Sequence, residues 1–179
     1  NAQPWRFVVR GNTIEIWKMP KYEHPVYNFR QRGTLLAHGA LIENMCIVAR
    51  VLGQTPTVEI VPDGMITDRI AVLTLTPSDT ISDPLFAVIE QRTTNRKPYK
   101  QQITEEECRT IQDIPSADPD VHIYWIADAE KKQTVAHAVS TTERIMLEDE
   151  ALHHEFFQSM RWSDGEEKAN PRGLYAKTL

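Results

Sequence analysis

The stretch RFVVRGNTIEIW at residues 6–17 decides the fold class. Residues 6–10 and 13–17 are β-forming runs on either side of Gly11-Asn12, a pair that tolerates positive φ and so predicts a hairpin turn. Pairing across this turn places the apolar side chains of both runs on one face of the hairpin. These side chains are Phe7, Val9, Ile14 and Ile16. That face needs another element of the chain to cover it.

The covering element is predicted at residues 34–52, TLLAHGALIENMCIVARVL. Apolar residues recur there at helical spacing over about five turns, and Gly53 follows as a helix stop. The apolar surface is broad, which predicts a central and mostly buried helix. The residues that carry the spacing are Leu35, Leu41, Ile42, Met45, Val48, Ala49 and Leu52.

Further strands are predicted at residues 57–61 and 69–76, separated by the turn-forming residues 62–64. Pro84 suits the first position of a helix, so a short helix is predicted at residues 85–91. Strands and helices are therefore mixed without a regular βαβ alternation. This pattern predicts an α+β fold, in which helices pack on a mixed or antiparallel sheet.

The second half of the chain is predicted to be mainly helical. The capping box at residues 104–107 opens a helix to about residue 114. Residues 121–127, VHIYWIA, have the composition of a strand, and a long helix is predicted from Asp128 to about residue 162. No element is predicted for residues 163–179. The fold class is thus α+β, with a long central helix and flanking helices.

The composition is that of a soluble globular protein with one domain of 179 residues. The net charge of -5 gives no general attraction to nucleic acid or to an anionic membrane. No apolar run reaches the roughly 18 residues of a membrane span, and no signal peptide is recognisable, so we expect a cytoplasmic protein. Cys46 and Cys108 lie far apart in predicted helices, which predicts reduced core thiols.

A basic segment, EQRTTNRKPY, occupies residues 90–99 of this acidic chain. Arg92 and Arg96 carry guanidinium groups that bind phosphate bidentately, and the hydroxyls of Thr93 and Thr94 can donate to the same oxygens. The alternative is a solvated loop in which Arg92 caps the preceding helix, because a helix C-terminus favours cations. The residues of this segment alone leave both interpretations open.

The first seven residues, NAQPWRF, are a second unusual segment. The amides of Asn1 and Gln3 both donate and accept hydrogen bonds, which suits the edge of a heteroaromatic ring with alternating carbonyls and ring nitrogens. The alternative is an irregular loop with Trp5 in the core.

Together the two segments resemble the nitroreductase family of FMN-dependent enzymes. The first is similar to the family's Asn-x-Gln-Pro-Trp-x-Phe loop, and RTTNRKPY resembles its Arg-x-Ser-x-Arg/Lys segment. The resemblance implies FMN as the cofactor. It assigns the FMN phosphate to Arg92, Thr94 and Arg96 with Thr93 nearby, and it places Asn1 and Gln3 beside the isoalloxazine ring. Residues 32–53 also look like the long central helix of that family.

The order of the segments resembles the double-module, Acg-like nitroreductase proteins, in which one chain imitates a homodimer. The resemblance implies that the sequence is an internal fragment. Residues 1–80 would be the second part of a first module, and residues 81–179 the first part of a degenerate second module. A pseudo-dimeric monomer or a homodimer, with at most one complete FMN pocket per chain, is then expected.

The implied activity is hydride transfer from NAD(P)H through FMN to a nitroaromatic or quinone-like acceptor. This scheme requires no catalytic side chain, and none is assigned. One alternative is a protein that binds or sequesters flavin without turnover, and another is a structural piece of the sheet. Glu150 and His153 have the spacing of a helical di-iron site, but the other ligands of such a site are missing, so no metal is expected.

Overall fold

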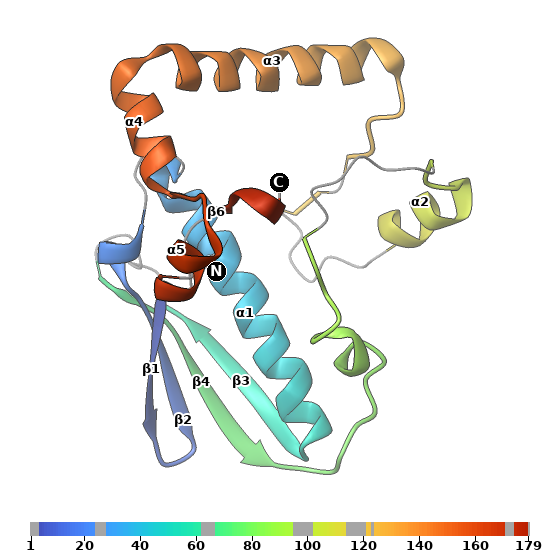
Figure 1. Ribbon diagram of the computed structural model, residues 1–179. Coiled ribbons are helices and arrows are strands. Elements are labelled where there is room, and N and C mark those ends of the chain that lie inside the picture. The colour runs from blue at the N-terminus through green and yellow to red at the C-terminus, as the bar shows by residue number, and fades with distance from the viewer. Residues whose placement is uncertain are drawn as a thin grey trace. The chain divides into compact units, whose positions relative to one another are not determined.

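The computed structural model describes residues 4–23, 28–61, 67–94, 102–113, 121–122, 124–170 and 174–178. Its two compact units are Asn1–Thr94 and Asn95–Leu179. The fold is α+β, with an antiparallel sheet and a long helix, which confirms the predicted class (Figure 1).

The first unit contains a four-stranded antiparallel sheet with the strand order β1-β2-β4-β3 (Figure 1). Arg10 pairs with Thr13, so the predicted hairpin and its register are confirmed. Strand β3 begins three residues earlier than predicted. The strands are β1 (Trp5–Arg10), β2 (Thr13–Lys18), β3 (Gln54–Ile60) and β4 (Arg69–Pro77).

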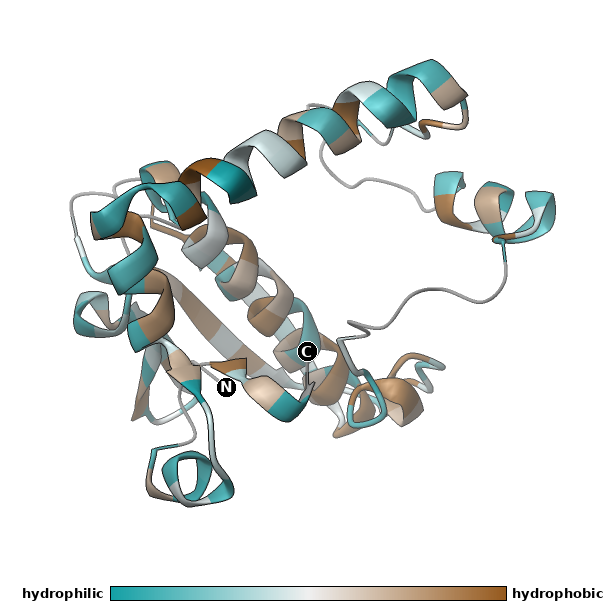
Figure 2. Ribbon diagram, turned by 45° about the horizontal axis from the view of Figure 1, so that its top comes forward, coloured by the Kyte–Doolittle hydropathy of each residue, from teal (hydrophilic) through white to brown (hydrophobic). Residues whose placement is uncertain are grey.

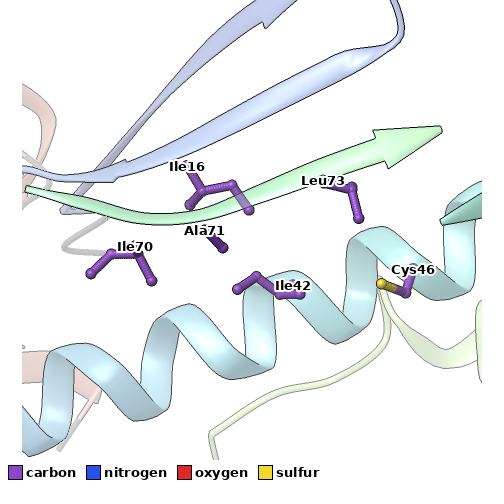
Figure 3. Packing of buried hydrophobic residues seen from close by; sticks show 6 residues of the cluster. All are labelled: Ile16, Ile42, Cys46, Ile70, Ala71 and Leu73. Carbon is purple, nitrogen blue, oxygen red and sulfur yellow. The ribbon is translucent and has the colours of Figure 1, made fainter. Parts of the chain in front are cut away.

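Helix α1 (Arg32–Val51) packs on one face of this sheet, as predicted for a central helix. The prediction that it is mostly buried was wrong, because only six of its 20 residues are buried. Figure 3 shows its side chains Ile42 and Cys46 directed at the strands, and Figure 2 shows hydrophobic residues recurring along the helix. The apolar face of the hairpin is covered mainly at β2, because Phe7 and Val9 of β1 stay 42% and 66% exposed. The core cluster consists of Ile16, Ile42, Cys46, Ile70, Ala71 and Leu73.

Helix α1 and its preceding turn, Phe29–Val51, are long and apolar enough to cross a membrane when judged by length and composition. This stretch meets that criterion although it is not an unbroken apolar run. His38, Glu43 and Asn44 interrupt the apolar run, but the average hydropathy remains 1.3. The core helix of a folded domain meets the same criterion of length and composition. Helix α1 packs on the sheet, as such a core helix does.

Gly53 ends α1 and turns the chain into β3. Its φ is +71°, a region that side chains with a Cβ rarely adopt. Its carbonyl accepts a hydrogen bond from the Ser78 backbone N–H at 2.9 Å. A Cβ at this position would lie 3.1 Å from the Ser78 carbonyl oxygen. Glycine is thus required both by the backbone conformation and by the close approach of Ser78.

We expect Gly53→Ala to lower the free energy of unfolding by about 1–3 kcal/mol, because it adds left-handed strain and a tight contact. The matched control is Gly39→Ala in the interior of α1, where a Cβ would meet nothing within 4 Å. This change should raise the free energy of unfolding by about 0.5–1 kcal/mol. Chemical denaturation measures both values, and a stabilising Gly53→Ala would contradict the described turn.

The predicted short helix at residues 85–91 is reduced to one 3-10 turn, Phe86–Val88. Its hydrogen bonds join residues three apart: Phe86 N–H to the Asp83 carbonyl and Val88 N–H to the Leu85 carbonyl, both at 3.1 Å. Asp83 also accepts from the Leu85 N–H through its side chain, at 2.9 Å. The turn is thus organised by Asp83, with no long apolar face to extend it.

In the second unit, helix α2 (Glu105–Gln112) starts at the predicted capping box. Thr104 Oγ1 accepts from the Glu107 N–H at 3.2 Å, and the Thr104 N–H donates to Glu107 Oε2 at 2.7 Å. These hydrogen bonds favour the ionised carboxylate, so they lower the pKa of Glu107. The sequence pattern of the capping box was sufficient to predict the start of α2, because the capping contacts join residues only three positions apart.

The predicted single helix from Asp128 to about residue 162 was wrong. The chain forms α3 (Ala129–Glu148) and α4 (Glu150–Gln158) instead, and Asp149 separates them with a ψ of 124°. The Asp149 N–H donates to the Ile145 carbonyl at 2.9 Å, and its carboxylate accepts from the Leu152 N–H at 3.0 Å. Asp149 therefore ends one helix and caps the next, a role that aspartate favours over a helix interior.

The predicted strand at residues 121–127 was also wrong for the part of it that the structure describes. Residues 121–122 and 124–127 are exposed and form no strand. Strand-forming composition alone does not order a strand, since the backbone needs a neighbouring strand to pair with.

The tail, for which no element was predicted, contains α5 and β6, and β5 lies just before it, where the helix was predicted to continue. A second capping box, between Ser163 and Glu166, starts the helix α5. Two short strands pair in parallel on either side of it. The elements are β5 (Met160–Arg161), α5 (Asp164–Ala169) and β6 (Leu174–Tyr175).

Candidate functional site

Arg92, Thr93 and Thr94 follow the 3-10 turn at the end of the first unit. The Arg92 N–H donates to the Val88 carbonyl at 3.1 Å, which closes the turn before the segment leaves it. The turn itself is held to the C-terminal end of α1, where Arg50 Nη2 lies 3.4 Å from Asp83 Oδ2. The three residues therefore extend from an anchored turn.

The side chains of these three residues are exposed. Among the residues that the structure describes, they make no hydrogen bond or ion pair with another side chain or with the backbone. One guanidinium and two hydroxyls thus present uncommitted donors within three consecutive residues, a set that suits a phosphate group. The donors present at this segment fit the phosphate of FMN.

The remaining predicted site residues, Asn1, Gln3 and Arg96, lie outside the described residues. The structure does show where the N-terminal segment enters the sheet. The Pro4 carbonyl accepts from the Met19 N–H at 2.7 Å, and the Trp5 ring meets the His38 ring edge-on at 5.8 Å between centroids. Trp5, the first residue of β1, therefore lies beside the N-terminal half of α1.

The two halves of the predicted site are anchored at different places along α1. Trp5 contacts His38, whereas Asp83 pairs with Arg50, twelve residues further along the same helix. At about 1.5 Å per residue these anchors are about 18 Å apart. The structure therefore places Trp5 and Asp83 at different points along α1.

A buried polar cluster lies next to this entry point, and the sequence reasoning missed it. Lys18 pairs with Trp5 across the hairpin and is only 5% exposed. Its Nζ donates to Gln31 Oε1 at 2.6 Å. Gln31 and the preceding Arg30 both have positive φ, 59° and 52°, so the turn before α1 is strained. The signal available in the sequence was strand alternation, which directs Lys18 to the helix-covered face.

His38 completes this cluster and is fully buried. Its Nδ1 lies 2.7 Å from the Thr34 carbonyl oxygen, which assigns the ring proton to Nδ1. Its Nε2 has no partner among the described residues. Asn28 holds Thr34 from outside, since its Oδ1 accepts from the Thr34 N–H at 3.1 Å and its Nδ2 donates to Thr34 Oγ1 at 2.7 Å. The cluster fixes the turn before α1 against the hairpin.

The Glu150 and His153 pair has a structural explanation. The His153 ring stacks on Phe157 at 4.4 Å, and its Nδ1 lies 3.0 Å from the Leu147 carbonyl oxygen. Within the described ranges, no group of three or more histidine, cysteine, aspartate or glutamate side chains could hold a metal ion.

The two cysteines differ in exposure. Cys46 is a buried core thiol, as predicted, but Cys108 is partly exposed on α2, so its assignment to the core was wrong. Burial and the neighbouring Glu43 raise the pKa of Cys46, although Arg50 acts in the opposite direction. Cys46 is therefore the less reactive thiol of the two by its burial.

No family model matches this chain. Among curated proteins, it is similar to "Putative NAD(P)H nitroreductase acg" of Mycobacterium tuberculosis, from strain CDC 1551 / Oshkosh and from strain ATCC 25618 / H37Rv. Each comparison gives 27% identity over 164 residues, which cover 88% of this chain and 48% of the relative. The chain thus spans about half the length of the curated relatives it matches. The similarity supports a nitroreductase-like protein and is consistent with the α+β fold.

Proposed function

We propose that this chain is part of an FMN-dependent oxidoreductase. The enzyme would pass hydride from NAD(P)H through bound FMN to a small-molecule acceptor of the nitroaromatic or quinone class. The observation that carries the proposal is the set of uncommitted donors at Arg92, Thr93 and Thr94. The similarity to "Putative NAD(P)H nitroreductase acg" of Mycobacterium tuberculosis supports the redox chemistry, since that name includes NAD(P)H, the proposed hydride donor.

In this proposal the chain positions the cofactor and supplies charge. The Arg92 guanidinium and the hydroxyls of Thr93 and Thr94 bind the FMN phosphate, together with Arg96. The amides of Asn1 and Gln3 lie at the edge of the flavin ring, where their donors and acceptors match the ring heteroatoms. FMN, when bound, supplies the hydride chemistry, so no side chain of this chain is assigned a catalytic proton transfer.

The proposed module arrangement follows the same resemblance. Residues 1–80 would form the second part of one nitroreductase-like module, and residues 81–179 the first part of a degenerate second one. The complete protein would then be a pseudo-dimeric monomer or a homodimer.

The proposal is tested by loading the protein with FMN, adding NADPH without oxygen, and following the visible absorbance of the flavin. We expect the colour to bleach and to return when a quinone or nitroaromatic acceptor is added. Persistent colour with NADPH and with NADH would contradict a reductase and favour a protein that sequesters flavin. Failure to take up FMN would contradict the proposal and favour the alternative that the chain is only a structural piece of the sheet.

A further inference from the structure

The second unit contains a groove of about 690 Å³ that the proposed flavin site does not use. Its volume falls within the range of small-molecule sites in proteins. One wall is a single face of α2, formed by side chains three or four positions apart: Glu105, Cys108, Arg109 and Gln112. Because these residues share one face of α2, the helix places polar, charged and thiol groups along the same groove.

The other wall comes from the segments that flank α2 and from the start of α3. Gln102 and Ile103 precede the capping box of α2, whereas Trp125 and Ala127 precede α3. Lys132 projects from the first turns of α3. Residues up to 30 positions apart in the sequence, Gln102 and Lys132, therefore line one groove within one unit.

Among the described residues that line the groove, the charged side chains carry a net positive charge. They are the cations Arg109 and Lys132 and the anion Glu105. Arg109 Nη2 lies 3.3 Å from Glu105 Oε2, so this ion pair engages one end of a guanidinium that has five N–H donors. Within the part of the chain that the structure describes, Lys132 has no ion pair. One positive charge is thus left for a ligand.

The groove also presents apolar surface. Trp125 is 38% exposed and Ile103 is 52% exposed. An indole face in contact with solvent stacks with planar aromatic rings and loses little conformational freedom on binding. Amide groups from Gln102 and Gln112 lie among these side chains and can donate or accept hydrogen bonds at the rim.

We propose that this groove binds a planar aromatic carboxylate. Trp125 and Ile103 contact the ring, and Arg109 and Lys132 bind the carboxylate. A single carboxylate matches the one uncompensated positive charge better than a doubly charged phosphate. The site differs from the proposed flavin site in its residues, because none of the described residues that line the groove is assigned to FMN.

The probe for this site is 2-naphthoate, with binding to the 179-residue chain measured by equilibrium dialysis. Neutral 2-naphthylmethanol keeps the ring but lacks the charge, and it should bind at least about tenfold more weakly. Arg109→Gln and Lys132→Gln should each weaken 2-naphthoate by about tenfold, because each removes a charge-assisted contact. Trp125→Leu should weaken both compounds by a similar factor.

The matched control is Arg144→Gln. Arg144 also forms an ion pair with a glutamate four positions away, Glu148, at 3.8 Å, but it lies on α3 and does not line the groove. Its replacement should leave the affinity for 2-naphthoate unchanged. Equal losses for Arg109→Gln and Arg144→Gln, or equal affinities for the charged and neutral compounds, would overturn the proposal.

Cys108 provides a second readout at the groove itself. Cys108 lines the groove, whereas Cys46 is buried in the first unit. Saturating 2-naphthoate should slow the alkylation of Cys108 by at least about fivefold, since the ligand covers the thiol, and should leave Cys46 unaffected. Binding without protection of Cys108 would place the ligand elsewhere and contradict the proposal.

Discussion

Leu73→Ala is expected to lower the free energy of unfolding of the first unit by about 2–5 kcal/mol. Leu73 is 1% exposed and lies at the centre of β4, where it pairs with Ile14 on one side and Val58 on the other. Removing its side chain leaves a cavity under α1, and both the lost burial and the cavity destabilise the fold. Chemical denaturation monitored by circular dichroism measures the difference.

The matched control for this prediction is Leu36→Ala. Leu36 is also a leucine of the first unit, but it is 76% exposed on α1. Its replacement should change the free energy of unfolding by no more than about 0.5 kcal/mol. If the two variants lost equal stability, the packing of α1 on β4 would differ from the packing described above.

The first unit could be predicted well because its signals are local and agree with each other. Gly11-Asn12 sets the hairpin turn, strand alternation sets the apolar face, and the apolar spacing after residue 34 supplies a helix to cover it. Each choice is confirmed by the register of Arg10 with Thr13 and by the core around Leu73. Consistency across these levels is what makes such a prediction hold.

The second unit was predicted less well because its elements depend on single residues and on partners. Asp149 interrupts a helical pattern that otherwise continues, and its capping contacts decide where α3 stops. Residues 121–127 have the composition of a strand, but no strand pairs with those of them that the structure describes. Short elements such as α5 depend on one capping box, which the sequence reasoning overlooked.

The candidate site was predicted from side-chain chemistry and resemblance, and the structure describes only the turn that precedes the basic segment and the first residues of that segment. It shows Arg92, Thr93 and Thr94 exposed on a turn that Asp83 and Arg50 anchor. It also adds the cluster of Lys18, Gln31 and His38 under the entry of the N-terminal segment. Strand alternation indicates the direction of Lys18, but its partner Gln31 could not be predicted, because this contact joins the hairpin to a strained turn before α1.

The second large effect is expected for the double variant Arg92→Ala, Arg96→Ala. It should bind FMN at least about 100-fold more weakly than the wild type, because two charge-assisted contacts to one phosphate are lost. The matched control is the double variant Arg10→Ala, Arg144→Ala, which removes the same charge at side chains that are 74% and 67% exposed. The control should retain wild-type affinity for FMN.

The most direct test of the proposed cofactor site is the affinity of this double variant for FMN, compared with that for riboflavin, which lacks the phosphate. Equilibrium dialysis gives both constants. We predict that the wild type binds FMN about 100-fold more tightly than riboflavin and that Arg92→Ala, Arg96→Ala removes this difference. If the double variant retained FMN at wild-type affinity, the basic segment would not be the phosphate site.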